Sequence, residues 1–103
     1  MAKLSLKVNP TFTAKVGIPV AGGEDADVML TFKHRTKTAL AEFANSRAEK
    51  TDVQSFLDMV EGWDLSDALT EANVAELLEN YIGAAVATYR TYVQELTKAR
   101  EKN

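Results

Sequence analysis

The sequence predicts an α+β fold, with an N-terminal β-hairpin or small antiparallel sheet followed by about four α-helices. Apolar residues recur at every second position up to about residue 34, and at helical spacing from Thr36 onward. Because the strands come first and the helices afterwards, the order favours α+β over an alternating α/β fold. A chain of 103 residues suits one domain. We expect a hairpin region at 1–34 and a helical region at 36–103.

The hairpin region contains three stretches in which polar and apolar residues alternate. The first, at 4–8, predicts a short strand with one solvated face and is followed by an Asn-Pro turn signal. The second and third, at 12–19 and 28–34, are joined by the connection "AGGEDAD" and predict a hairpin. The segment at 4–8 can add a third strand. Because two strands alone are marginal in water, the hairpin must rest on the helices.

The helical region divides at its capping signals. The helical period begins at Thr36, Thr51 and Thr70 are expected to cap the second and third helices, and the last helix is expected to start at about Ala84. The pattern Thr-Asp-Val-Gln at Thr51 is a capping box, and Gly62 is expected to end that helix. We expect the last helix to reach about Arg100. The apolar stripe of the third helix is predicted to comprise Val74, Leu77, Leu78, Tyr81 and Ile82.

The composition excludes several classes of site. The chain has no cysteine, so disulfides, thiolate zinc sites and thiol nucleophiles are excluded, in keeping with a reducing cytoplasm. The first ten residues lack the continuous apolar segment of a signal peptide. No apolar run approaches the ~20 residues that span a bilayer, so we expect no membrane partner.

Charge is distributed unevenly along the chain. Residues 1–50 hold eight Lys and Arg against five Asp and Glu, a balance of +3, whereas residues 51–103 hold four against ten, a balance of −6. The acidic half repels phosphate backbones, which argues against a nucleic-acid partner. It could attract the basic half of a neighbouring copy, which favours a homo-oligomer assembled head to tail.

The residues able to carry chemistry do not form a recognisable catalytic or metal site. The acids at 24–27 lack the spacing of a calcium loop and indicate a solvated turn. His34, the single histidine, has no evident partner for acid–base catalysis. Asp64 and Asp67 precede a helix and suit a loop cap and first-turn acids. We therefore predict no enzyme activity, and no catalytic, cofactor-binding or metal-binding residues.

Five residues are candidates for partner binding: Trp63, Tyr89, Tyr92, Lys33 and Arg35. Trp63 follows a helix-ending glycine, where it could plug a corner between helices or anchor an interface. The two tyrosines share this ambiguity, because a buried tyrosine keeps a polar tip. Lys33 and Arg35 belong to a small basic patch that could contact an acidic surface. The patch is too small, and too poor in aromatic residues, for a nucleic-acid-binding face.

The chain resembles the tail assembly chaperones of long-tailed bacteriophages with non-contractile tails. The resemblance rests on four stretches read together: "VMLTFKHRTKTALAEF" (28–43), "VEGWDL" (60–65), "LTEANVAELLENYIGAAVATYRTYVQEL" (69–96) and "KAREKN" (98–103). The first is similar to a strand followed by a helix, the second to a Gly-Trp corner and the third to paired helices. Residues 1–27 match only in being strand-like.

The resemblance implies a non-catalytic role in the host cytoplasm and no cofactor. Members of the family bind the long, helical tape-measure protein, keep it soluble and help to recruit tail-tube protein, and they are absent from the mature virion. The end at Asn103 would correspond to the short product of a gene that also makes a longer, frameshifted one. Binding would occur by a helix-in-groove contact, with several copies covering the tape measure.

Two other functions remain open at this point. A small nucleic-acid-binding regulator could use Lys33, His34, Arg35 and Lys37. An unrelated cytoplasmic adaptor could have the same helical pattern.

Overall fold

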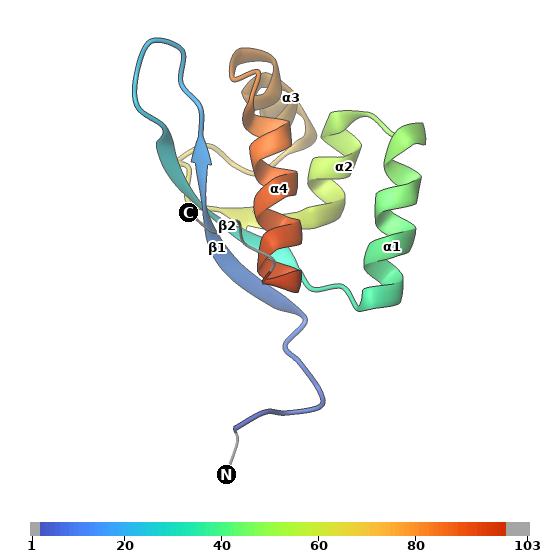
Figure 1. Ribbon diagram of the computed structural model, residues 1–103. Helices are drawn as coiled ribbons and strands as arrows, with labels where there is room; N and C mark the ends of the chain where they lie inside the picture. Colours follow the sequence, from blue (N-terminus) through green and yellow to red (C-terminus); the bar gives the residue numbers. More distant parts are fainter. Residues whose placement is uncertain (1–2, 99–103) are drawn as a thin grey trace.

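The computed structural model describes residues 3–98 and confirms the α+β class. Within this range, three strands form one antiparallel sheet of order β1-β2-β3, and the helices pack against it (Figure 1). The elements, in chain order, are β1 (Thr11–Ile18), β2 (Ala26–Lys33), α1 (Lys37–Ser46), a 3-10 turn η1 (Arg47–Glu49), α2 (Asp52–Met59), β3 (Val60–Trp63), α3 (Glu71–Asn80) and α4 (Ala84–Thr97). Helix α4 lies along β1, and α2 contacts both α3 and α4.

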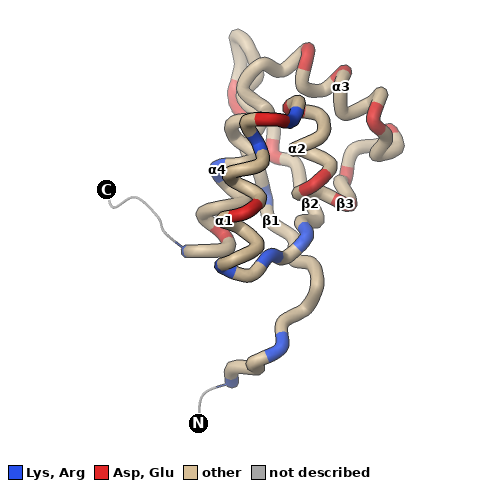
Figure 2. The backbone as a smooth tube through the Cα atoms, turned by 90° about the vertical axis from the view of Figure 1, so that its right-hand side faces the viewer, with Lys and Arg blue, Asp and Glu red and all other residues tan. Residues whose placement is uncertain are grey.

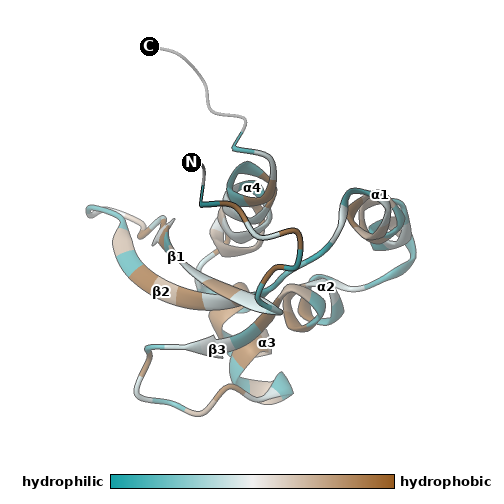
Figure 3. Cartoon of the chain, turned by 90° about the horizontal axis from the view of Figure 1, so that it is seen from below, coloured by the Kyte–Doolittle hydropathy of each residue, from teal (hydrophilic) through white to brown (hydrophobic). Residues whose placement is uncertain are grey.

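The predicted hairpin is confirmed. Strand β1 pairs with β2 from Thr11 opposite Lys33 to Ile18 opposite Ala26. Alternate side chains of both strands are buried, and Figure 3 shows the alternation of hydropathy along β2. The period of two places every second side chain on the helix-covered face, which is why the hairpin is stable in this setting.

The third strand is not where the sequence predicts it. The expected strand at 4–8 is wrong, because these residues pair with no strand in the structure. Helix α2 ends at Met59 instead of Gly62, and the next four residues form β3 along the free edge of β2, with Leu30 opposite Trp63. Gly62 serves this strand: a Cβ there would lie 3.3 Å from the Thr31 Cβ, so glycine permits the close pairing.

The predicted helix starts are confirmed by their caps. The Thr36 hydroxyl accepts from Ala39 N at 3.1 Å, and the Thr70 hydroxyl accepts from Asn73 N at 3.1 Å. Both halves of the capping box at Thr51 are formed with Gln54. Helix α4 begins at Ala84 without a side-chain cap.

The end of α3 also differs from the prediction. Helix α3 stops at Asn80, so the expected stripe is wrong at its last two residues. The chain leaves helical geometry at Tyr81, which is 39% exposed, and Ile82 is 91% exposed. Helix α4 reaches Thr97, and the expected end at Arg100 lies outside the described residues.

An aromatic cluster forms the centre of the core. The Tyr92 ring lies 5.2 Å from the Phe32 ring and 5.9 Å from the Phe43 ring, and Phe12 stacks on Phe32 at 5.4 Å. These rings come from both strands of the hairpin, from α1 and from α4. The cluster therefore joins the hairpin and helical regions into one core.

Candidate partner-binding grooves

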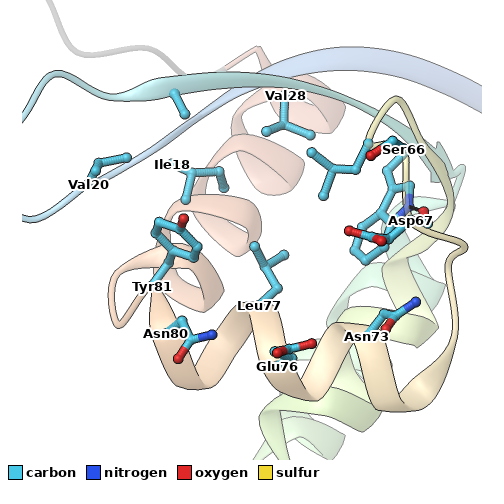
Figure 4. A pocket seen from close by; sticks show the side chains of 13 residues that line it. Ile18, Val20, Val28, Ser66, Asp67, Asn73, Glu76, Leu77, Asn80 and Tyr81 are labelled. Carbon is cyan, nitrogen blue, oxygen red and sulfur yellow. Dashed lines mark hydrogen bonds between the residues drawn. The ribbon is translucent and has the colours of Figure 1, made fainter.

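The first candidate site is a groove between the hairpin and α3. We call it the hairpin–α3 groove; it encloses about 400 Å³ and is lined mainly by Ile18, Val28, Trp63, Leu65, Leu77 and Tyr81, with Asp67, Asn73, Glu76 and Asn80 as polar residues. Figure 4 shows Ile18 and Val28 facing Leu77 across the groove. An apolar floor with acidic residues suits an extended segment that carries both apolar and basic side chains.

Trp63 forms one wall of this groove and is fixed in place. Its Nε1 donates to the Asp67 carbonyl oxygen at 2.7 Å, and its ring meets Phe56 edge-on at 6.2 Å between centroids. The adjacent loop is tied to the sheet, since Met29 N donates to Asp64 Oδ1 at 3.0 Å. Asp64 thus holds the backbone of β2 and does not cap the following helix, and Asp67 is not in the first turn of α3, where the acidic residue is Glu71. Trp63 remains half-buried, so it both fills the corner and presents a surface.

The second candidate site is a groove between α1 and α4. We call it the α1–α4 groove; it encloses about 480 Å³ and is lined by Leu40, Ala41, Ala44, Tyr89, Val93 and Leu96, with His34, Arg35 and Lys37 at one end. Ala41 and Ala44 are exposed, whereas the residues from α4 are half-buried. The small side chains on α1 leave an apolar channel between two helices, which is the shape that accepts a third helix.

Neither groove contains a metal site or lies in a membrane-spanning segment. Within residues 3–98, no three His, Cys, Asp or Glu side chains are placed to hold a metal ion. No helix in this part of the chain is long and apolar enough to cross a bilayer. His34 lies half-buried at the end of β2, where its backbone N donates to the Pro10 carbonyl oxygen at 2.8 Å.

The sequence matches the model of a protein family described as phage tail assembly chaperone over residues 1–103, the whole chain. The chain belongs to the phage tail assembly chaperone family. No curated protein and no solved structure matches it.

Arg35 of the chaperone, expected in a free basic patch, is part of the architecture. Its Nη1 donates to the Asp58 carbonyl oxygen at 2.8 Å and to the Tyr92 hydroxyl at 2.9 Å, and its guanidinium lies 4.4 Å from the centre of the Phe43 ring. Lys33 Nζ donates to the Leu57 carbonyl oxygen at 3.2 Å. Both cations thus satisfy carbonyls in the last turn of α2, where the helix dipole favours positive charge. The free basic surface is smaller than the sequence suggests.

Tyr92 of the chaperone is fully buried and is not accessible to a partner in this conformation. Its hydroxyl donates to the Lys33 carbonyl oxygen at 2.7 Å and accepts from Arg35. Burial raises the pKa of Tyr92 above its ordinary value, and the hydrogen bond and charge of Arg35 partly oppose that rise. Three of the predicted site residues, Lys33, Arg35 and Tyr92, therefore meet in one network that joins β2, α2 and α4.

Tyr89 of the chaperone lies half-buried in the α1–α4 groove. The Arg47 guanidinium lies 3.6 Å from the centre of its ring, a cation–π contact that fixes the ring, and Phe43 packs 6.3 Å away. The structure therefore places Tyr89 in the α1–α4 groove and Trp63 in the hairpin–α3 groove. Partner contact at the five candidate residues stays a prediction.

Sequence reasoning missed most of the groove-lining residues of the chaperone. Leu40, Ala41 and Ala44 of α1 line the α1–α4 groove, and none of them is among the residues that the sequence predicts to bind a partner. The sequence signal that could have predicted this groove is the pair Ala41 and Ala44. These small residues lie three apart on one helix and permit the close approach of another element. The hairpin–α3 groove has no comparable local pattern, because its residues come from four separate segments.

Proposed function

We propose that this chaperone binds the phage tape-measure protein, keeps it soluble and promotes assembly of the tail tube, without catalysing a reaction. Membership of the family and the α1–α4 groove support the proposal. The groove is the observation that carries the proposal, because it is an exposed apolar surface of defined shape to which a partner can bind. The site of action would be the host cytoplasm, with the chaperone released before the virion matures. Tail-tube protein would be a further partner.

The groove suits an amphipathic helix. Helix α1 has 10 residues, so the channel beside it is about 15 Å long and fits roughly three helical turns. Ala41 and Ala44 allow the bound helix to approach α1 closely, and Leu40, Val93 and Leu96 supply apolar contacts for its stripe. Lys37 is exposed at one end of the groove, which favours an acidic residue in the bound helix.

Coverage of apolar stripes would explain how the chaperone keeps its partner soluble. A long helical protein with an exposed apolar stripe aggregates until another surface covers the stripe. Each copy covers only about three turns, so many copies are needed along one tape-measure protein. Weak contacts repeated along the same partner add up, because each bound copy raises the effective concentration of the next.

The experiment is co-production of the chaperone with the tape-measure protein of its phage, measuring the soluble fraction of the tape measure and its co-purification. Ala41→Arg and Ala44→Arg fill the groove with long side chains and are expected to abolish both. Because both alanines are exposed, the variants should melt at the wild-type temperature. Ala75→Arg, on an exposed part of α3 outside both grooves, is the matched control. Unchanged co-purification with the two groove variants would contradict the proposed site.

A further inference from the structure

The first described residues form an arm that contacts little of the molecule. Residues 3–9, the N-terminal arm, precede the start of β1 and project away from the body (Figures 1 and 2). Leu4 is 85% exposed, Leu6 98% and Val8 59%. Three large apolar side chains in one short segment, all in solvent, are unusual for a soluble protein and indicate a surface that becomes covered by another molecule.

The arm has the side-chain pattern of a segment that binds on one face. In an extended conformation Leu4, Leu6 and Val8 point to one side, and Lys3, Ser5 and Lys7 point to the other. The apolar side chains can then enter a groove while both lysines stay at its rim. A matching site needs an apolar floor and acidic residues beside it.

We propose that the arm of one copy binds in the hairpin–α3 groove of a second copy. The groove has the required floor in Ile18, Val28 and Leu77, and its acidic residues are Asp67 and Glu76. By contrast, the α1–α4 groove has Arg35 and Lys37 at one end, and these cations repel the arm lysines. Charge therefore selects the hairpin–α3 groove as the partner of the arm.

The arm cannot fill the hairpin–α3 groove of its own chain. The arm is anchored at Pro10, next to the start of β1, whereas Ile18 lies at the far end of that strand. Strand β1 spans about 24 Å between those ends at about 3.4 Å per residue. Residues 3–10, fully extended, reach about 25 Å at most. An arm folded back along β1 would use its whole length to reach Ile18, so it could not place Leu4, Leu6 and Val8 together at that end of the groove.

The resulting contact is heterologous, because the arm and the groove are different surfaces at opposite ends of the molecule. Figure 2 shows the arm at one end, with its lysines, and the acidic residues of α3 at the other. Repetition of such a contact gives a ring if the rotation closes and an open filament if it does not. The assembly needs no tape-measure protein, so its test and the test of the proposed function can fail independently.

Cysteine cross-linking of the purified chain tests the contact directly, because the native sequence has no cysteine. A Leu6→Cys protein, carrying a tag that distinguishes its mass, is mixed with a Ser66→Cys protein and oxidised. Ser66 is exposed and lines the groove, so a disulfide between the two proteins is expected in high yield. Thr38→Cys, exposed on α1 and outside both grooves, is the control partner. Equal yields with Ser66→Cys and Thr38→Cys would overturn the proposal, as would an intramolecular disulfide in the Leu6→Cys/Ser66→Cys double variant.

Light scattering after size exclusion supplies a second measurement. The wild-type mass is expected to rise above the monomer mass of 11.3 kDa as concentration increases, whereas Leu6→Asp stays at 11.3 kDa. Because Leu6 is almost fully exposed, Leu6→Asp should leave the melting temperature of the monomer unchanged. An oligomer that survives Leu6→Asp, or a wild-type chain that stays monomeric, would contradict the proposal.

Discussion

At the scale of single residues, Arg35 and Tyr92 show that residue types frequent in interfaces can also hold the fold together. An arginine in a run of basic residues and a tyrosine on a helix both suggest an interface. In the structure each satisfies the other: the guanidinium donates to the tyrosine hydroxyl and to the Asp58 carbonyl oxygen. Arginine suits this position because its planar group stacks on Phe43 while it donates two hydrogen bonds. Lysine could not reproduce that geometry.

Tyr92→Phe should reveal this network through the pH dependence of stability. At neutral pH the variant loses the hydrogen bond to the Lys33 carbonyl oxygen, and we expect a cost of about 1–2 kcal/mol in the free energy of unfolding. Burial, opposed in part by Arg35, raises the folded-state pKa of Tyr92 above its unfolded value. The wild-type contribution is therefore fully present below pH ~10, and it falls as the pH rises from ~10 through the folded pKa.

Urea denaturation between pH 7 and pH 11 measures this effect. The difference in unfolding free energy between wild type and Tyr92→Phe is expected to narrow above pH ~10. Tyr81→Phe is the control, because Tyr81 is exposed and its ring is not in the core. A difference that stays constant up to pH 11 would show that ionisation of Tyr92 does not oppose folding.

At the scale of elements, the start of α4 fits closely against the end of β1. A Cβ on Gly83 would lie 2.9 Å from Pro19 Cγ and 3.3 Å from Pro19 Cβ. The proline ring cannot rotate away, so any side chain at this position must push the helix off the hairpin. This contact holds α4 in register along β1, and it also sets the end of the hairpin–α3 groove near Tyr81.

Gly83→Ala is therefore expected to lower the free energy of unfolding by about 1–3 kcal/mol, by overpacking. Gly23→Ala is the matched control, because a Cβ at Gly23 would meet only Val20 Cγ1 at 3.9 Å. We expect that control to change stability by less than about 0.5 kcal/mol. Chemical denaturation of both variants checks the pair, and equal stabilities would show that the start of α4 can move without cost.

The same scale explains how far the sequence predicts the fold. Helix starts follow from side chains that bond within three residues, so the caps at Thr51 and Thr70 could be predicted directly from the sequence. The third strand depends on pairing between β2 and a segment about thirty residues away, which no local pattern reports. The segment at 4–8 has the better strand pattern but pairs with no strand within residues 3–98, whereas Val60–Trp63 lies beside the free edge of β2.

The candidate sites show the same limit. Trp63 and Tyr89 were chosen because aromatic residues are frequent in interfaces, and each does line a groove. The same reasoning from residue type selects Tyr92, but Tyr92 is buried. The exposure of a side chain depends on how the helices pack and not on residue type. Grooves are formed by residues from several elements, so their outline follows only from the tertiary structure.

At the scale of the whole molecule, the charge difference between the two halves of the sequence becomes a separation in space. Figure 2 shows Asp and Glu along α3, and Lys and Arg along the N-terminal arm and near the start of α1. Net charge of −3 does not reveal this polarity. A molecule with oppositely charged ends attracts copies of itself in a head-to-tail orientation and repels the reverse orientation. The proposed contact between arm and groove joins these two ends.

Self-association should therefore weaken as salt is added. The Debye length falls from about 30 Å at 0.01 M to about 3 Å at 1 M, so attraction between exposed ends is screened over this range. We expect the mass measured by light scattering at fixed protein concentration to decrease as sodium chloride is raised between these two concentrations.

The double variant Asp67→Asn/Glu76→Gln, which removes the acidic groups of the groove but keeps its apolar floor, should form smaller oligomers with a weaker salt dependence. Asp52→Asn/Glu49→Gln, which removes two exposed charges outside the groove, is the matched control and should behave as wild type. A mass that does not respond to salt would mean that apolar contacts alone determine association, and the complementary charges would then have no part in the choice of partner.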